Sequence, residues 1–153
     1  MTDRSVTHAT FVVEHAYKAA PAKVFAAFAS SDAKAQWFGA PDDAVNPNLK
    51  LDFRVGGKET TSGGMGAPVY KYEAAYQDIV TDQRIVTTYN MWTDDDLISV
   101  SVATIALRAE GDTTHLTYTE QGAFLDGKDQ PSDREHGTRE MLVNALPRYL
   151  ERA

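Results

Sequence analysis

The chain has 153 residues, a net charge of −7 and no cysteine, and 42% of its residues are hydrophobic. A chain of this length normally forms one folded unit, so we expect a single domain over residues 1–153. The acidic balance argues against nucleic acid and membrane surfaces as partners, and the lack of cysteine excludes disulfides and thiol chemistry. Residues 1–8 are polar and no apolar run reaches about 18 residues, so we expect a cytoplasmic protein.

The first elements expected are a strand and two short helices. Residues 7–17 alternate in polarity, and one face of this strand carries Phe11, Val13, His15 and Tyr17. Pro21 then opens an alanine-rich helix, because proline is tolerated in the first helical turn. We expect Asp32 to cap a second short helix that ends at Gly39.

Strands dominate the middle of the chain. Residues 48–61 predict a hairpin or sharp bend around the adjacent glycines at 56 and 57. In residues 69–80 the alternation places Tyr70, Tyr72 and Tyr76 on one face. Two β-branched segments then flank a turn of three aspartates at 94–96, and a last strand follows at 114–122.

Residues 131–153 predict an amphipathic helix. Its apolar face comprises Met141, Leu142, Ala145, Leu146, Tyr149 and Leu150. We expect Ser132 or Asp133 to cap its start. Because Pro147 has no N–H, it should kink the helix or end its regular hydrogen bonding.

The order of these elements predicts an α+β fold, in which about seven antiparallel strands form a curved sheet against the C-terminal helix. A helix is about 10–12 Å wide, whereas strands lie about 4.8 Å apart, so one helix cannot cover such a sheet. A cavity between the sheet and the helix is the expected consequence.

Several segments carry a resemblance to a known family. They are APAKVFAAFASSDAKAQWFG, LDFRVGGKE, RIVTTYNM, ISVSVATI, TEQGAFLDG and REHGT. Together they resemble the START-like (SRPBCC) superfamily, in the branch similar to the C-terminal domain of the activator of heat-shock protein 90 ATPase. The last two segments resemble a bacterial subgroup whose members are mostly uncharacterised, although His15 lies where that subgroup is expected to have arginine.

The resemblance implies a helix-grip fold with an internal ligand cavity. It does not imply a particular reaction, because carriers, cyclases, oxygenase domains and chaperone regulators share this fold.

Two inward-facing polar residues are candidates for catalysis. His15 could act as a general base or orient a ligand, or it could be a core histidine paired with a carboxylate or carbonyl. Glu120 shares a strand face with Leu116 and Tyr118, so it needs a partner or a raised pKa. Its candidate partners are Arg54, Arg134 and His136. A Glu120–His136 pair would either move a proton or fix the long helix.

A second group of residues is expected to line the cavity. The aromatic members suit an amphipathic organic ligand, because tyrosine joins an apolar ring to one hydroxyl. The ligand-binding candidates are Trp37, Phe38, Arg54, Tyr72, Tyr76, Tyr89 and Glu120, with a surface position as the alternative for Arg54.

No metal or cofactor is expected. The histidines, His8, His15, His115 and His136, have no close ligand spacing. Residues 122–129 fit the pattern G-x-x-x-x-G-K, but Asp129 stands where a phosphate-binding loop requires serine or threonine.

Three functions remain open. The first is binding of a small hydrophobic or amphipathic molecule, with residues 56–68 expected to be mobile because they hold five of the ten glycines, and to gate the entrance. The second is an enzyme using the same cavity for acid–base chemistry of the cyclase or hydrolase kind. The third is a co-chaperone-like module that regulates an ATPase through a protein partner. A homodimer is also possible, because two-fold symmetric assemblies are common.

Overall fold

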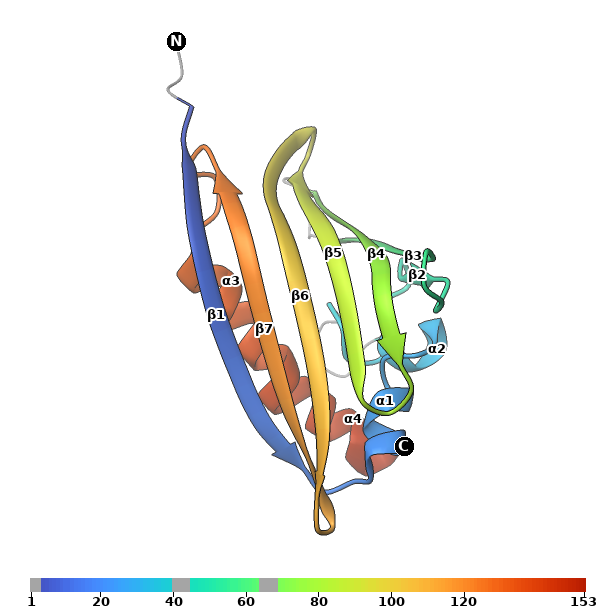
Figure 1. Cartoon of the computed structure of the whole chain (residues 1–153). Helices are drawn as coiled ribbons and strands as arrows, with labels where there is room; N and C mark the ends of the chain where they lie inside the picture. The colour runs from blue at the N-terminus through green and yellow to red at the C-terminus, as the bar shows by residue number, and fades with distance from the viewer. Residues whose placement is uncertain (1–3, 40–44, 64–68) are drawn as a thin grey trace.

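The computed structural model describes residues 4–39, 45–63 and 69–153, and shows a curved antiparallel sheet with a long helix against its concave side (Figure 1). The strands of the described ranges are β1 (Val6–Tyr17), β2 (Lys50–Leu51), β3 (Lys58–Gly63), β4 (Tyr70–Val80), β5 (Arg84–Thr93), β6 (Asp96–Glu110) and β7 (Thr113–Leu125). They are arranged in the order β1-β7-β6-β5-β4-β3-β2. Consecutive strands therefore pair from β2 to β7, and β1 crosses over to pair with β7. This confirms the predicted α+β, helix-grip arrangement.

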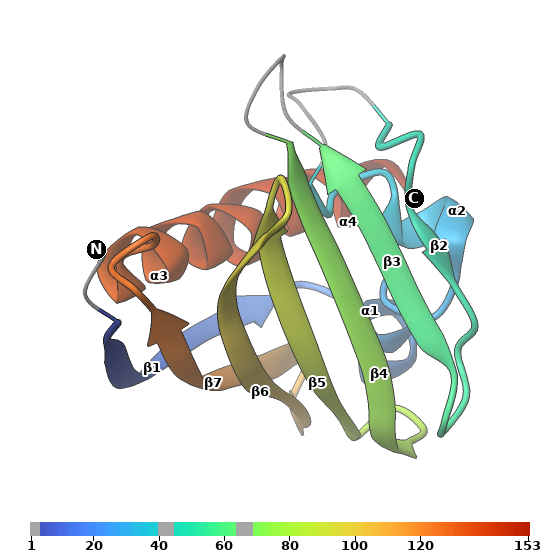
Figure 2. The same cartoon turned by 90° about the horizontal axis from the view of Figure 1, so that it is seen from above.

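Two short helices follow β1, and a long helix ends the chain. The short ones are α1 (Pro21–Ala26) and α2 (Ser31–Lys34). The long helix runs through α3 (Pro131–Glu140), a π-helical turn η1 (Met141–Ala145) and α4 (Leu146–Arg152). Seen from above, it lies in the hollow of the curved sheet, with α1 and α2 near its α4 end (Figure 2).

The helix starts differ from the expected caps. Ser30, and not Asp32, caps α2, because its hydroxyl accepts a 3.1 Å hydrogen bond from the N–H of Ala33. The long helix starts at Pro131, so Ser132 and Asp133 lie inside its first turn and cannot cap it. The fixed φ of proline favours this earlier start.

The first part of the glycine-rich segment forms regular, hydrogen-bonded structure, and its mobility stays a prediction. The N–H of Gly56 donates to the carbonyl of Tyr76, and the N–H of Tyr76 donates to the carbonyl of Gly57. A side chain at Gly57 would clash, because its Cβ would lie 2.0 Å from the carbonyl oxygen of Asp52. Residues 58–63 form β3. Residues 64–68, the rest of the expected gate, lie outside the described residues.

The predicted disturbance at Pro147 is confirmed as a change of hydrogen-bond pattern. The N–H of Leu146 donates to the carbonyl of Met141, five residues earlier, instead of that of Leu142. The next donor along the helix would be Pro147, which has no N–H. The Leu142 carbonyl is therefore left without either helical donor, and the hydroxyl of Tyr17 donates to it at 2.6 Å.

The core lies between the concave face of the sheet and the long helix. The inward face of β1 buries Phe11, Val13 and Tyr17, as the alternation predicted. They belong to one cluster with Leu142 and Leu146 of the helix. Within the described ranges, no helix is both long and apolar enough to cross a membrane.

Candidate functional site

A cavity of about 100 Å³ lies between the sheet and the long helix. Its walls come from α2 and the turns that follow α1 and α2, from strands β4 to β7, and from α3 and η1 of the long helix. The residues that line it include Lys34, Trp37, Phe38, Tyr72, Tyr76, Thr87, Tyr89, Met91, Ala103, Tyr118, Arg134, Thr138 and Met141. All five aromatic residues expected at a cavity, Trp37, Phe38, Tyr72, Tyr76 and Tyr89, border it.

The aromatic side chains form a continuous wall. The Trp37 ring meets the Phe38 ring edge to face at 5.9 Å between centroids, and Phe38 meets Tyr72 at 5.3 Å. Tyr72 then lies 4.8 Å from Tyr89. The indole N–H of Trp37 donates to the carbonyl of Ala27, which fixes this end of the wall to the turn after α1. Such a wall suits a flat apolar ligand.

A buried ion pair borders the cavity on the α2 side. The ammonium of Lys34 lies 2.8 Å from Oε1 of Glu59 and 4.4 Å from the centre of the Phe38 ring. The hydroxyl of Tyr76 donates to the same Oε1 at 2.5 Å. Glu59 is fully buried, and its Oε2 has no hydrogen-bond partner in the described part of the chain. The positive charge of Lys34 and the negative charge of Glu59 therefore balance each other in a buried, largely apolar environment.

A second buried carboxylate, Glu120 on β7, is held by an extended network. Its Oε2 accepts from the hydroxyls of Tyr89 at 2.7 Å and Ser101 at 3.0 Å. Its Oε1 accepts from the hydroxyl of Tyr118 at 2.6 Å. One guanidinium nitrogen of Arg134 lies 3.4 Å from Oε2, which balances the charge of the carboxylate. Both carboxylate oxygens of Glu120 therefore accept hydrogen bonds from the protein, and Glu120, expected as a ligand-binding residue, is not among the side chains that line the cavity.

Arg134 is itself fixed from several sides. It donates to the hydroxyls of Tyr89 and Ser99, each at 2.8 Å, and to the carboxylate of Asp129 at 2.7 Å. Burial alone would lower the pKa of Arg134, but Tyr89, Glu120 and Asp129 raise it above its ordinary value. Asp129, which stands where a phosphate-binding loop requires serine or threonine, thus forms an ion pair that fixes the guanidinium of Arg134.

The cavity tyrosines stay protonated at neutral pH. Burial is the main cause, and the nearby carboxylates of Glu59 and Glu120 add to it; together they raise the pKa of Tyr72, Tyr76, Tyr89 and Tyr118 well above the ordinary value. The hydroxyls of Tyr76, Tyr89 and Tyr118 therefore act as hydrogen-bond donors to the buried carboxylates of Glu59 and Glu120.

Three hydroxyls of the lining have no partner in the described part of the chain. They belong to Tyr72 on β4, Thr87 on β5 and Thr138 on α3. None is among the side-chain atoms that are sealed in without a partner, so they face open space. A hollow of about 270 Å³ adjoins the cavity and shares Phe38, Tyr72, Met91 and Met141 with it. These four residues form the boundary between the cavity and the outside.

The structure does not bring the predicted catalytic residues together. His15 is half-buried on the inward face, where its ring contacts Tyr17 at 4.9 Å, but it does not line the cavity. Burial lowers the pKa of His15. His136 is exposed, so the expected Glu120–His136 pair does not form, and Arg134 takes that place.

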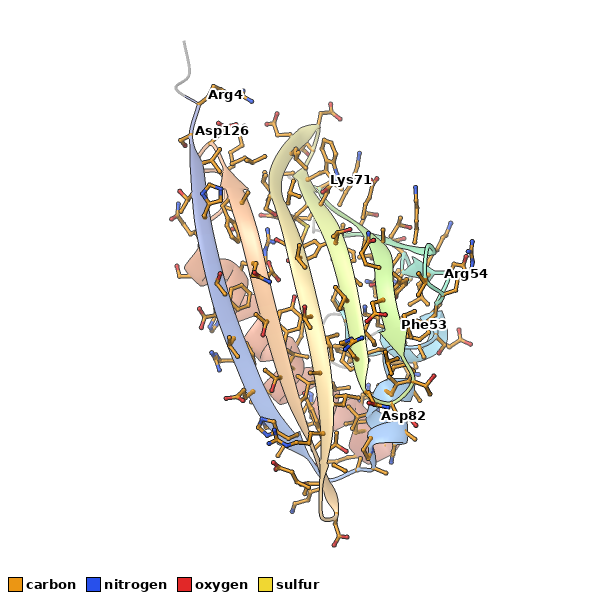
Figure 3. The ribbon with its side chains drawn as sticks, viewed as in Figure 1. Arg4, Phe53, Arg54, Lys71, Asp82 and Asp126 are labelled. Atoms are coloured by element: carbon orange, nitrogen blue, oxygen red, sulfur yellow. The ribbon has the colours of Figure 1, made fainter. Side chains whose placement is uncertain are left out.

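Arg54 also lies elsewhere than the ligand-binding expectation placed it. It is exposed at the edge of the sheet and points away from it (Figure 3). Its guanidinium pairs with Asp52 at 2.7 Å. The surface alternative for this residue is therefore correct.

Sequence reasoning missed Lys34 and Glu59. Lys34 precedes Trp37 and Phe38 by three and four residues, the spacing of one helical face, which was a usable signal. Within the described ranges, no group of three or more metal-ligating side chains comes together.

Comparisons with known proteins agree with this architecture. A solved structure of an uncharacterised protein from Rhizobium leguminosarum is 38% identical and superposes with a TM-score of 0.93, covering 99% of this chain and 100% of its own. The Mll3558 protein from Rhizobium loti is 44% identical, with a TM-score of 0.86 over 95% of this chain and 99% of its own. An AHSA1-like protein from Aeromonas hydrophila, 17% identical, shares the fold with a TM-score of 0.68 over 94% of this chain and 92% of its own.

No curated protein matches the chain. A family model described as "Activator of Hsp90 ATPase homolog 1-like protein" matches residues 18–151. This match covers nearly the whole chain and confirms the START-like resemblance of its segments. The chain belongs to the Activator of Hsp90 ATPase homolog 1-like family.

Proposed function

We propose that the protein binds a small, largely apolar organic molecule in the cavity between the sheet and the long helix. The observation that carries this proposal is a cavity lined by an aromatic wall and by hydroxyls that have no partner among the described residues. Simple core packing would fill this space and would not leave the hydroxyls of Tyr72, Thr87 and Thr138 facing it without a partner in the described part of the chain.

The size of the cavity limits what fits without rearrangement. At about 100 Å³ it is smaller than the roughly 300–1,000 Å³ of sites for drug-sized ligands. A molecule built on one ring is the appropriate size. A larger ligand requires side chains at the boundary to move, and Met91 and Met141 are suited to this because methionine is flexible.

Acid–base catalysis has less support. None of the three candidate residues, His15, Glu120 and His136, lines the cavity. The carboxylate of Glu120 is already bound by Tyr89, Ser101, Tyr118 and Arg134. An enzyme that uses this cavity therefore stays a prediction from the sequence. So does a module that regulates an ATPase through a protein partner, which the cavity does not bear on.

The test is a thermal-shift screen against single-ring and amphipathic compounds. A compound present at 100 times its dissociation constant should stabilise the fold by about 2.7 kcal/mol, a rise in Tm of about 5–10 °C. Ala103→Leu should remove the response, because Ala103 is buried in the cavity wall and the larger side chain fills the space. The matched control is Ala106→Leu, the same change on the exposed face of β6. An unchanged response in Ala103→Leu, or no response to any compound, would contradict the proposal.

A further inference from the structure

The charges around the cavity point to the kind of ligand it accepts. Among the described residues, Lys34 and Arg134 are the charged side chains that line it. Lys34 pairs with Glu59, and Arg134 pairs with Glu120 and Asp129. Counting these partners, two positive groups face three negative ones. No positive charge is left over for an anionic ligand.

Most of the charged groups in this charge balance are buried. The side chains of Lys34 and Arg134 are 8% and 9% exposed, and those of Glu59 and Glu120 are completely buried. Water therefore screens their charges poorly, and a ligand carboxylate placed among them would meet uncompensated negative charge. Burying a charge without a partner is strongly unfavourable.

The polar groups that remain available are neutral. The hydroxyls of Tyr72, Thr87 and Thr138 can each donate and accept a hydrogen bond. They suit an alcohol, phenol or ketone oxygen. Thr87 lies beside Tyr76 in the β4–β5 pairing, so one such hydroxyl is next to the Glu59 site.

We infer that the cavity selects an uncharged, oxygen-bearing single-ring ligand and excludes the corresponding carboxylate, and that Glu59 sets this preference by neutralising Lys34. The inference rests on the proposed binding function and specifies its ligand class. Glu59 acts here as a specificity-determining residue, because it determines whether the ammonium of Lys34 is free to attract an anion.

The first experiment uses the unmodified chain and three probes of similar size: benzyl alcohol, benzoate and toluene. Binding is followed at pH 7.5 by ¹H–¹⁵N chemical-shift titration. Benzyl alcohol should bind at least about tenfold more tightly than benzoate, which is ionised at this pH. Toluene should bind but more weakly than the alcohol, because it leaves the hydroxyls unpaired. Equal or tighter binding of benzoate would overturn the inference and leave the proposed function standing. If none of the three shifts the cavity resonances, the proposed function itself fails for ligands of this size.

The second experiment changes the charge of the pair. Glu59→Gln keeps an oxygen that accepts from Lys34 and Tyr76 but removes the negative charge. The ammonium of Lys34 is then unbalanced, and the affinity for benzoate should rise at least about tenfold while that for benzyl alcohol changes little. The matched control is Glu73→Gln, which makes the same change in net charge at an exposed position on β4. Unchanged benzoate binding in folded Glu59→Gln would overturn the role of Glu59.

A third variant covers the case in which Glu59→Gln does not fold. The double change Lys34→Met with Glu59→Gln removes both charges and leaves no buried ion unpaired. It should bind benzyl alcohol and still exclude benzoate, because the ammonium is gone. Binding of benzoate by this double variant as tightly as benzyl alcohol would show that an anion enters without a free ammonium, which would overturn the role of Glu59.

Discussion

The hydroxyl of Tyr17 on β1 donates a 2.6 Å hydrogen bond to the carbonyl of Leu142 in the long helix. That carbonyl receives no hydrogen bond from the helix backbone, because the N–H of Leu146 donates to the carbonyl of Met141 and Pro147 has no N–H. One side chain thus satisfies the backbone group that the π-helical turn leaves open. The same turn supplies Met141 and Leu142 to the cavity wall.

Tyr17→Phe should therefore destabilise the protein by about 1–3 kcal/mol, because it leaves a buried carbonyl without a donor. The free energy of unfolding from urea titration measures this. The control is Tyr70→Phe, which makes the same change at a tyrosine that is 47% exposed and should cost less than about 0.5 kcal/mol. Similar losses in the two variants would show that the Leu142 carbonyl finds another donor.

Glu120→Ala should cost about 3–5 kcal/mol, because it leaves the buried guanidinium of Arg134 with only Asp129 to balance it. Glu110→Ala is the comparison, since Glu110 pairs with Arg108 on the surface and its loss should cost much less than that of Glu120. Chemical denaturation of both variants gives the two values. A small loss for Glu120→Ala would mean that the network around Glu120 is not held by its charge.

Phe25→Ala should cost about 3–5 kcal/mol, because Phe25 is 7% exposed and packs edge to face on Phe53 at 5.5 Å. Lys71→Ala on the outer face of β4 should cost less than about 0.5 kcal/mol. Thermal and urea unfolding of the pair measure the difference. Reversed values would mean that the faces of β4 and the packing of α1 are assigned wrongly.

The pH dependence of stability should carry a contribution from His15. Burial lowers the pKa of His15 in the folded state, so the unfolded chain binds a proton more readily. The stability that neutral His15 provides is present above its unfolded pKa of about 6.5 and is lost as the pH falls through its folded pKa. His15→Gln should therefore lose less stability than the unmodified protein between pH 8 and about pH 5. Urea titrations of both proteins across this pH range measure the free energy of unfolding. If the two free energies change in parallel with pH, the contribution of His15 is contradicted.

Thr87→Val should weaken binding of benzyl alcohol about fivefold and leave toluene unaffected, because it removes one free hydroxyl from the cavity without changing the side-chain shape. Thr104→Val, on the outer face of β6, is the control and should alter neither affinity. Chemical-shift titration gives both constants. An equal loss for alcohol and toluene would indicate a change in packing and not a lost hydrogen bond.

The strand pattern and the aromatic wall could be predicted from the sequence, because alternation fixes which face of a strand is buried. Whether Arg134 or His136 pairs with Glu120 depends on how the long helix is rotated about its own axis. Arg134 and His136 are two residues apart, about 200° around a helix, so only one can face the sheet. Residues four apart lie on the same face of a helix, and Leu142, Thr138 and Arg134 follow this spacing. Because Leu142 belongs to the apolar face of the helix, this spacing could have predicted that Arg134, and not His136, faces the sheet.

Glu59 could not be found in the same way. Its strand, Lys58–Gly63, holds no large apolar residue that would reveal which face is buried. Only pairing with β4, where Glu59 lies opposite Ala74, shows that it faces inward. The buried ion pair that bears on the ligand class is therefore a product of long-range pairing.

The pairing of β1 with β7 has a consequence for biosynthesis. Val6 pairs with Leu125 and Tyr17 with Thr114, so within the described ranges the first strand to be made pairs with the last one, β7. At about 5–20 residues per second, a translating ribosome takes roughly 6–24 s to reach Leu125 after Val6. During that interval the backbone N–H and C=O groups of β1 have no partner strand. Closure of the sheet must wait until most of the chain has been synthesised, and this non-local step should limit the rate of folding.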